Sequence, residues 1–245
     1  MKTSRKNKNV LITGGSRGIG AEAVRQFAAE GSSVAFLYKS SNQKALELSK
    51  ATGALNIKCN VASSPSVKAA MDVANEFFEG QLDVLICNAG ISDFGLFTDF
   101  DEDRWSNMIE TNLNGVYRCV RAVLPGMISR KKGSIIIVSS MWGQVGASCE
   151  VAYSTAKAGL IGMTKALAKE EGPSGIRVNC ICPGLIDTDM NANVSKAAQE
   201  DIIYDTPLSR IGTPADVVKV MKFLASDQSS FVTGQIIGVN GGLII

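Results

Sequence analysis

The sequence of 245 residues contains no histidine. This absence excludes a Ser-His-Asp triad and every mechanism in which an imidazole moves a proton. It also removes a common zinc ligand, and we predict that the protein holds no metal. If the chain is an enzyme, its acid or base must be another kind of side chain.

A strong charge imbalance and a long apolar run are also absent. The 25 lysines and arginines against 23 aspartates and glutamates leave a net charge of +2, which gives no strong field for nucleic acid. No apolar run approaches the ~20 residues of a membrane helix, and the basic opening is followed by too short a run for a signal peptide. We therefore predict a cytoplasmic protein with no nucleic-acid partner and no membrane partner.

The six cysteines form no C-x-x-C pair, which favours reduced thiols in a cytoplasm. Cys180 and Cys182 lie close together in an apolar stretch. We expect them to be buried thiols that point to opposite faces of a strand and share no metal.

Short apolar runs alternate with helical patterns along the chain. The runs begin with NVLIT at 9–13 and SSVAFLY at 32–38, and they end with GQIIGVNGG at 234–242. They are continuously apolar, as in strands that helices cover on both faces, and this pattern indicates a parallel sheet. We predict one Rossmann-type α/β domain over residues 1–245, doubly wound, with helices on both faces of the sheet.

The second half of the chain is expected to hold three long helices and one irregular stretch. The helices are predicted at about 102–127, 151–171 and 214–225. Ser64-Pro65 and Thr213-Pro214 each place a capping hydroxyl before a proline at the first helical position. The stretch from 183 to about 204 shows no clear period, so we expect it to be irregular and to form a substrate lid at about 185–210.

The stretch TGGSRGIG at 13–20 follows the first predicted strand and opens the first predicted helix. Gly14, Gly18 and Gly20 stand where the backbone must turn tightly and approach a pyrophosphate. The N-terminus of the helix then offers unpaired N–H groups and a positive dipole end to the phosphates. This context predicts a dinucleotide cofactor, and a turn that only packs helix on strand is the alternative.

The choice of dinucleotide depends on the end of the second strand, where an acid would bind both ribose hydroxyls and repel a 2'-phosphate. That place reads Tyr38-Lys39-Ser40 and holds no carboxylate. Arg17 and Lys39 can pair with the phosphate. We therefore predict NADPH as the cofactor, with NADH less favoured.

Several motifs together resemble the short-chain dehydrogenase/reductase family over almost the whole chain. They are TGGSRGIG, CNAG at 87–90, Asn112, Ser140, YSTAK at 153–157 and PGLIDTDM at 183–190. Within this family the chain most resembles the bacterial 3-oxoacyl-[acyl-carrier-protein] reductases. The resemblance implies an oxidoreductase that reduces a ketone to a secondary alcohol by hydride transfer.

The resemblance also implies four catalytic residues. Tyr153 is the proton donor, and Lys157 supplies, from one helical turn away, the positive charge that lowers the pKa of a phenol normally near ~10. The Ser140 hydroxyl bonds the substrate carbonyl where negative charge develops. Asn112 holds a water that links Lys157 to the solvent.

A larger set of residues is implied to hold the cofactor. It combines the glycine turn, the ends of the second and third strands, the CNAG motif, the catalytic tyrosine and lysine, and a cover over the nicotinamide. The members are Gly14, Ser16, Arg17, Gly18, Ile19, Gly20, Tyr38, Lys39, Ser40, Asn60, Val61, Asn88, Ala89, Gly90, Tyr153, Lys157, Pro183, Gly184 and Thr188. Asn60 stands where the family usually has an aspartate, and Thr188 is expected to bond the carboxamide.

The sequence leaves the substrate open. An acidic carrier protein needs a basic rim at the mouth of the site, and the cluster at 130–132 offers one, although Ser174 stands where related reductases carry a basic residue. Trp142 and Glu150 are expected beside Ser140 in the substrate pocket. A carboxylate there is unusual for a plain acyl chain and would suit an amine-bearing ketone.

Several alternatives therefore stand beside a 3-oxoacyl thioester carried by acyl-carrier protein. The pattern around Trp142 and Glu150 is similar to reductases that act on an aminopentanone group attached to a lysine of elongation factor P. A steroid or sugar alcohol would use the same chemistry, and a dinucleotide-sensing scaffold without catalysis is the alternative of another class. Family members usually assemble through the two long helices, the last strand and the apolar tail GGLII, so a homotetramer is expected.

Overall fold

Seven parallel strands form one sheet in the order β3-β2-β1-β4-β5-β6-β7. The computed structural model describes residues 8–192 and 194–245; residues 1–7 and 193, which the predicted domain and lid include, lie outside the described residues. The strands are β1 Asn9–Thr13, β2 Ser33–Tyr38, β3 Leu55–Lys58, β4 Val84–Cys87, β5 Gly133–Val138, β6 Ile176–Pro183 and β7 Ile236–Val239. The order reverses between β1 and β4, which leaves a crevice at their carboxyl ends.

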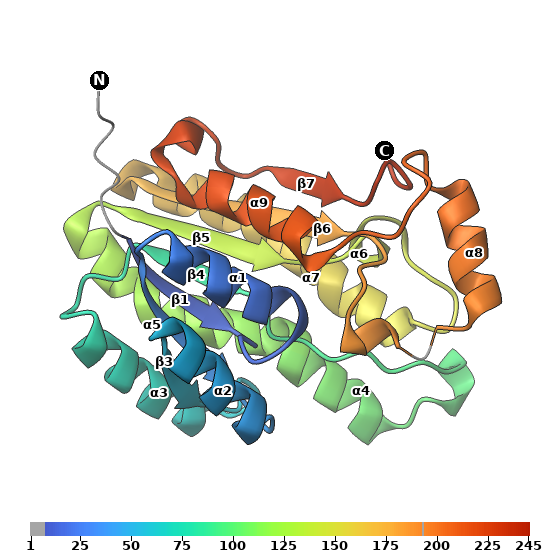
Figure 1. Ribbon diagram of the computed structural model, residues 1–245, viewed down its shortest axis with the longest axis horizontal. Coiled ribbons are helices and arrows are strands. Elements are labelled where there is room, and N and C mark those ends of the chain that lie inside the picture. Colours follow the sequence, from blue (N-terminus) through green and yellow to red (C-terminus); the bar gives the residue numbers. More distant parts are fainter. Residues whose placement is uncertain (1–7, 193) are drawn as a thin grey trace.

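Helices cover both faces of this sheet (Figure 1). They are α1 Gly18–Ala29, α2 Asn42–Thr52, α3 Ser64–Phe77, α4 Glu102–Ile109, α5 Gly115–Arg130, α6 Trp142–Val145, α7 Val151–Glu171, α8 Lys196–Asp205 and α9 Pro214–Ala225. Buried side chains of α1, α2 and α9 belong to one core cluster, and those of α3, α5 and α7 belong to the other. The predicted doubly wound Rossmann-type α/β fold is confirmed.

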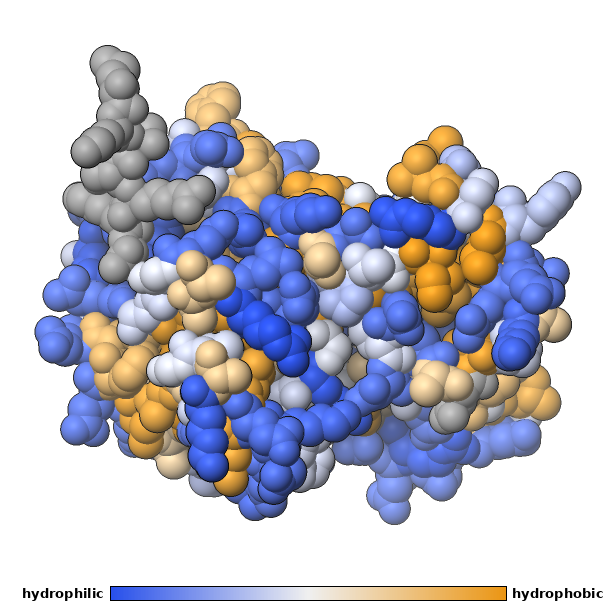
Figure 2. All heavy atoms as spheres, in the orientation of Figure 1, coloured by the Kyte–Doolittle hydropathy of each residue, from blue (hydrophilic) through white to orange (hydrophobic). Residues whose placement is uncertain are grey.

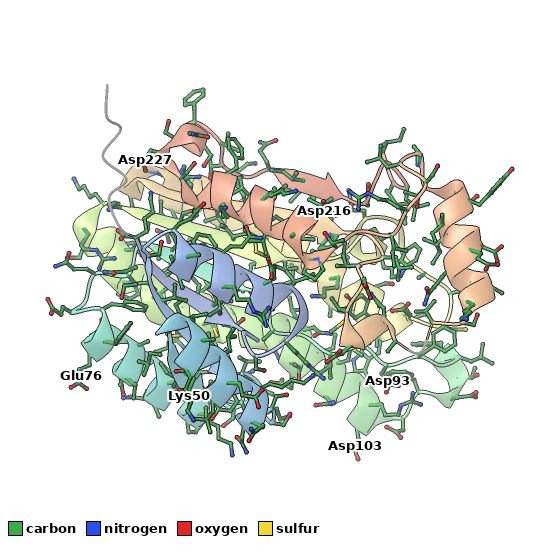
Figure 3. All side chains as sticks on the ribbon, in the orientation of Figure 1. Lys50, Glu76, Asp93, Asp103, Asp216 and Asp227 are labelled. Carbon is green, nitrogen blue, oxygen red and sulfur yellow. The ribbon has the colours of Figure 1, made fainter. Side chains whose placement is uncertain are left out.

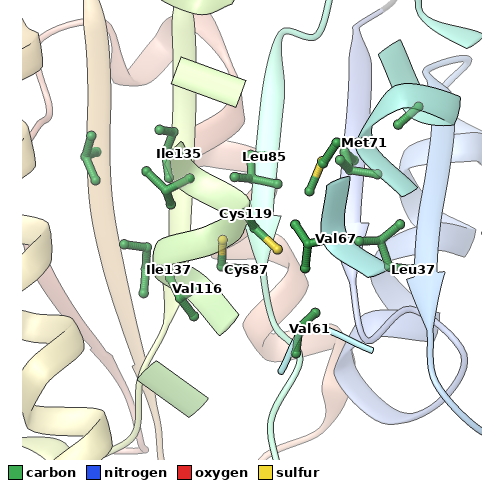
Figure 4. Close-up of a cluster of buried hydrophobic side chains, with 14 of the residues drawn as sticks. Leu37, Val61, Val67, Met71, Leu85, Cys87, Val116, Cys119, Ile135 and Ile137 are labelled. Atoms are coloured by element: carbon green, nitrogen blue, oxygen red, sulfur yellow. The ribbon is translucent and has the colours of Figure 1, made fainter. Parts of the chain in front are cut away.

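The continuous apolar runs follow from this double cover. In β1, Leu11 packs into the cluster under α3 and α5, whereas its neighbours Val10 and Ile12 pack into the cluster under α1 and α9. Successive residues of a strand point to opposite faces, so a strand that is buried on both faces is apolar at most of its positions. Figure 4 shows the cluster under α3 and α5, where Leu85 and Ile135 of the central strands face the helices.

The expectation for Cys180 and Cys182 was wrong about their direction. Both are fully buried and both belong to the cluster that also holds Val178. Residues i and i+2 of a strand point to the same face, because the side-chain period of a strand is two. The prediction that they are buried thiols holds.

Helices α3 and α9 begin near Pro65 and Pro214 as predicted, but the capping residue of α3 differs from the predicted one. Thr213 caps α9 as predicted, in a capping box in which its hydroxyl accepts from the N–H of Asp216 and the Asp216 carboxylate accepts from the N–H of Thr213. Figure 3 labels Asp216 at this end of α9. For α3, however, the capping hydroxyl belongs to Ser63, which accepts from the N–H of Ser66. Pro65 is then the second helical residue, a position whose N–H needs no intrahelical partner.

Two predicted segments differ from the structure. The helix expected at about 102–127 is α4 and α5 joined by a π-helical segment, Glu110–Asn114, and it continues to Arg130. The stretch expected to be irregular contains α8, in which no residue is buried. A helix in which no side chain is fully buried needs only a weak apolar period in its sequence, which is why this helix was missed.

The face drawn in Figure 2 is mostly hydrophilic, with hydrophobic side chains gathered where the C-terminal end lies beside α8. Leu208 and Ile245 are among the exposed apolar residues. Within residues 8–192 and 194–245, no helix is both long enough and apolar enough to cross a membrane.

Candidate active site

A cleft runs along the carboxyl ends of the central strands. It consists of a cavity of about 340 Å³ at the glycine turn and a cavity of about 130 Å³ beside α7. Ile19, Asn88, Gly90 and Thr188 line both cavities, so the two are continuous. Open α/β sheets bind their ligands at this edge, where the strand order reverses.

The glycine turn has almost no room for side chains. Gly14 has a φ of +67°, and a Cβ added there would stand 2.8 Å from Cα of Ala89. A Cβ on Gly20 would stand 2.2 Å from the carbonyl oxygen of Gly14. The amide of Asn88 donates to the carbonyl oxygens of Thr13 and Gly14, at 3.2 Å each, and fixes the turn against the next strand.

The first turn of α1 is open toward the cleft. Its N-cap residue is Arg17, whose side chain has no oxygen to accept from the N–H groups of that turn. Such groups bind phosphate readily because the positive end of the helix dipole adds to them. The turn therefore fits the pyrophosphate of a dinucleotide.

The end of the larger cavity that is predicted to hold adenosine is formed by the ends of β2 and β3. Tyr38, Lys39 and Ser40 line it together with Asn60 and Val61, and their role in binding the cofactor stays a prediction. No acidic residue follows β2, and Arg17 and Lys39 are exposed. The Asn60 side-chain oxygen accepts from the N–H of Ala62 at 3.2 Å, so it stabilises its own turn.

The catalytic candidates converge at the other end of the cleft. Ser140, Tyr153 and Lys157 all line the smaller cavity. Lys157 is buried, donates to the carbonyl oxygen of Val138 at 2.9 Å, and lies 5.5 Å from the centre of the Tyr153 ring. Ser139 ties β5 to α7, because its hydroxyl donates to the carbonyl oxygen of Lys157 at 2.7 Å.

Burial controls the charges of this group. It raises the pKa of Tyr153 to about 12, against a lowering effect of the Ser140 hydroxyl and with a further raising effect of the Glu150 charge. Burial also lowers the pKa of Lys157 to about 8. The described residues alone therefore leave the phenol a weak acid, and the lowering of its pKa expected from Lys157 needs more positive charge in the cleft.

Asn112 is fully buried in the π-helical segment and clamps the loop after β4. Its side-chain oxygen accepts from the N–H of Ile91 and its amide donates to the carbonyl oxygen of Ile91, both at 2.8 Å. A Cβ added to Gly90 would stand 3.0 Å from the Asn112 oxygen and 3.5 Å from the Lys157 nitrogen. The segment thus brings the CNAG motif against Lys157.

Thr111 is a cleft residue that the sequence reasoning missed. It lines the larger cavity, and its hydroxyl is the only buried side-chain polar atom in the described part of the chain without a hydrogen-bond partner. Buried hydroxyls are normally satisfied, so a ligand in the cleft has a polar atom to bond. Its place next to Asn112 was the one signal available.

The segment after β6, which holds Pro183, Gly184 and Thr188, lines one end of the cleft, and their role as a cover over the nicotinamide stays a prediction. Pro183 and Gly184 line the smaller cavity, and a Cβ on Gly184 would stand 2.8 Å from Cα of Asn240. Thr188 reaches the glycine turn, because its methyl carbon lies 3.3 Å from the place of a Cβ on Gly18.

Trp142 and Glu150 also line the smaller cavity. Glu150 is half-buried, and burial raises the pKa of its carboxyl. It forms no ion pair with another residue of the described ranges. A carboxylate with this environment is available to a ligand.

The expected basic rim lies elsewhere. Residues 130–132 precede β5, so they are at the amino end of the sheet, opposite the cleft of the same chain. Arg130 donates to the carbonyl oxygens of Gly80 and Leu82, and Lys132 pairs with Asp83 at 2.6 Å. The cluster fastens α5 to neighbouring loops, and within one chain it does not border the site.

The fold and this cleft define a dinucleotide-binding α/β protein. The family described as "Enoyl-(Acyl carrier protein) reductase" matches residues 14–244. The chain belongs to the short-chain dehydrogenase/reductase family and is an oxidoreductase. The predicted resemblance is confirmed, and the family uses nicotinamide dinucleotide cofactors.

Three relatives show how far the similarity extends. The chain is 41% identical over 242 residues to 3-oxoacyl-[acyl-carrier-protein] reductase FabG of Staphylococcus aureus, with 96% of this chain and 98% of that protein covered. It is 39% identical over 241 residues to the FabG reductase of Chlamydia muridarum, with 97% of each covered. It is 38% identical over 238 residues to the uncharacterized oxidoreductase YmfI of Bacillus subtilis, with 96% and 98% covered.

Proposed function

We propose that the chain reduces a 3-oxoacyl thioester, carried by acyl-carrier protein, to the secondary alcohol with NADPH as the hydride donor. The observation that carries the proposal is the convergence of Ser140, Tyr153 and Lys157 at one end of a cleft whose other end is the glycine turn. Two full-length relatives, at 41% and 39% identity, are named 3-oxoacyl-[acyl-carrier-protein] reductases.

The residues of the cleft fit the cofactor. The first turn of α1 would hold the pyrophosphate, Thr111 offers an unpartnered hydroxyl, and Lys157 lies where ribose hydroxyls can replace the carbonyl oxygen of Val138. When bound, the cofactor supplies the hydride and, in its oxidised form, positive charge beside the phenol. Arg17 and Lys39, with no acid after β2, support the choice of NADPH.

The chain's own residues manage the proton and the developing charge. Ser140 donates to the carbonyl oxygen of the substrate, on which negative charge develops. Tyr153 gives that oxygen its proton, and its pKa of about 12 would fall when the positive charge of the oxidised cofactor adds to that of the Lys157 ammonium. Asn112 keeps Gly90 beside Lys157. Water molecules leading from Lys157 past Asn112 to the solvent would return a proton to Tyr153.

The segment at about 185–210 is proposed as a lid over the substrate. It begins at the end of β6, contacts the glycine turn through Thr188 and carries α8, which buries no residue. Such a weakly anchored element can open without disturbing the core.

Glu150 supports a second candidate function. Its carboxylate lines the catalytic cavity without an ion-pair partner in the described ranges and is held in a half-buried place where a cation would stabilise it. A ketone that carries an amine, such as the aminopentanone group on a lysine of elongation factor P, would provide that cation. A plain acyl chain would not.

The experiment compares oxidation of NADPH and NADH with acetoacetyl thioester and with a panel of amine-bearing, steroid and sugar ketones. Preferred NADPH turnover on the thioester supports the first function, and turnover confined to amino ketones supports the second. Glu150→Gln should then lower activity on the cationic ketone and spare the thioester; equal effects on both would remove Glu150 from substrate choice. No turnover with any ketone would favour the scaffold.

A further inference from the structure

The segment after β6 crosses the cleft completely. From Thr188 over the glycine turn it continues to Asp189, whose carboxylate pairs with the Lys44 ammonium of α2 at 2.8 Å. Lys44 lies in the first turn of α2, just after the strand end Tyr38-Lys39-Ser40. The ion pair therefore joins the proposed lid to the corner of the cavity that would receive the phosphate on the adenosine ribose.

This corner has a second hollow of about 440 Å³ beside the main cavity. Charged side chains surround it: Arg17 and Arg25 of the first crossover, Lys44 and Glu47 of α2, and Asp189. The hollow and the main cavity share Arg17 and Asp189. Lys44 and then Arg17 lower the pKa of Asp189, which shows that both cations act on the same carboxylate.

The ion pair between Lys44 and Asp189 can be broken at little cost in free energy. Its side chains are 58% and 55% exposed, and ion pairs in such surroundings add little stability because water solvates both partners. A phosphate monoester carries about −1.5 to −2 charges and three acceptor oxygens, against one charge on a carboxylate. Lys44 would therefore leave Asp189 for a phosphate that enters the corner.

We propose that Lys44 is a further specificity residue for the 2'-phosphate of NADPH, and that Asp189 competes with the phosphate for it. The inference rests on the proposed use of NADPH. Asp189 holds the lysine beside the corner in the free protein and gives it up when the phosphorylated cofactor binds. A dinucleotide without the 2'-phosphate leaves the pair intact, so it gains nothing from Lys44.

Binding of adenosine 2',5'-bisphosphate and of adenosine 5'-monophosphate, which lacks only the 2'-phosphate, is measured by calorimetry on the full chain and isolates this contact from catalysis. Lys44→Gln should weaken binding of the 2',5'-compound by roughly 3- to 10-fold and leave the 5'-compound unchanged. Lys50→Gln is the matched control, since Lys50 stands in the last turn of the same helix, as Figure 3 shows, and should change neither value.

Asp189→Asn separates competition from simple positioning. Binding of the 2',5'-compound should tighten by about threefold, and the gain should vanish in the Lys44→Gln background, because Asp189 acts through Lys44. Weaker binding in Asp189→Asn, or a Lys44→Gln protein that keeps the full preference, overturns the inference. If the unmodified chain binds both compounds equally, the choice of NADPH itself has failed.

Discussion

The two ends of the cleft are built in different ways. At the glycine turn the walls are backbone: an added Cβ at Gly14 or Gly20 would lie 2.8 Å or 2.2 Å from another backbone atom. At the substrate end the walls are side chains from separate segments, among them Trp142, Glu150 and Met190. A wall of backbone accepts one ligand shape, whereas a wall of side chains changes shape with each substitution. The fold therefore restricts the class of cofactor more tightly than it restricts the substrate.

The largest expected effect tests whether the substrate end is catalytic at all. Tyr153→Phe removes the only proposed proton donor, so kcat should fall by about 10²- to 10⁴-fold. The cofactor should still bind, because most of its predicted contacts lie elsewhere in the cleft, above all at the glycine turn. Steady-state rates and calorimetric binding on the same sample check this, and a variant with ordinary turnover would contradict the proposed role.

Gly20→Ala tests the backbone wall. The new Cβ would overlap the carbonyl oxygen of Gly14, 2.2 Å away, and the turn cannot move without its partner Asn88. We expect dinucleotide affinity to fall by more than about 100-fold and stability by about 1–3 kcal/mol, as for other overpacked sites. Calorimetry measures the loss of affinity and urea unfolding the loss of stability. If both affinity and stability were retained, the turn would have more room for a side chain than these distances indicate.

Lys157→Met tests what the catalytic charge costs the fold. The lowering of the amine pKa from 10.5 to about 8 means that the buried charge destabilises the fold by about 3 kcal/mol. Removing the charge regains this energy, but the loss of the hydrogen bond to Val138 offsets about 1 kcal/mol of the gain. The folded pKa is below the unfolded pKa, so the charged form is penalised at every pH below about 8, and the penalty disappears as the pH rises from 8 to 10.5.

The variant should therefore be inactive but melt several degrees higher than the parent at neutral pH, with the advantage gone above pH 10.5. Thermal unfolding across this range measures it. An advantage that does not change with pH would assign the gain to packing.

Gly162→Ala is the smallest effect and the counterpart of Gly20→Ala. Gly162 lies inside α7, and an added Cβ there meets no described atom within 4 Å. Replacing glycine in a helix should stabilise the monomer fold by up to about 1 kcal/mol. If the predicted homotetramer packs through this helix, size-exclusion chromatography will instead show weaker assembly.

The glycine turn could be predicted from the sequence in more detail than the other parts of the cleft. TGGSRGIG predicts its turn closely, since Gly14 and Gly20 are each required by a close backbone contact. The proposed lid could be given only as a range, because α8 has no fully buried residue and its sequence pattern is weak. The Lys44–Asp189 contact joins residues 145 positions apart, and the basic cluster at 130–132 was misplaced because charge alone does not say which end of a strand it occupies.

The π-helical segment Glu110–Asn114 has a consequence for insertions and deletions. A π turn contains one residue more than an α turn, so the wide turn absorbs the extra residue and keeps the helices on either side in phase. Deleting Leu113 would make α4 and α5 one regular helix and leave Arg104 on the side where it binds Asp93, at 2.7 Å. The loss would fall on Asn112, which bonds Ile91 from within this turn and so holds the loop after β4. One lost codon would therefore release that loop while both helices and every proposed catalytic side chain stayed in the sequence.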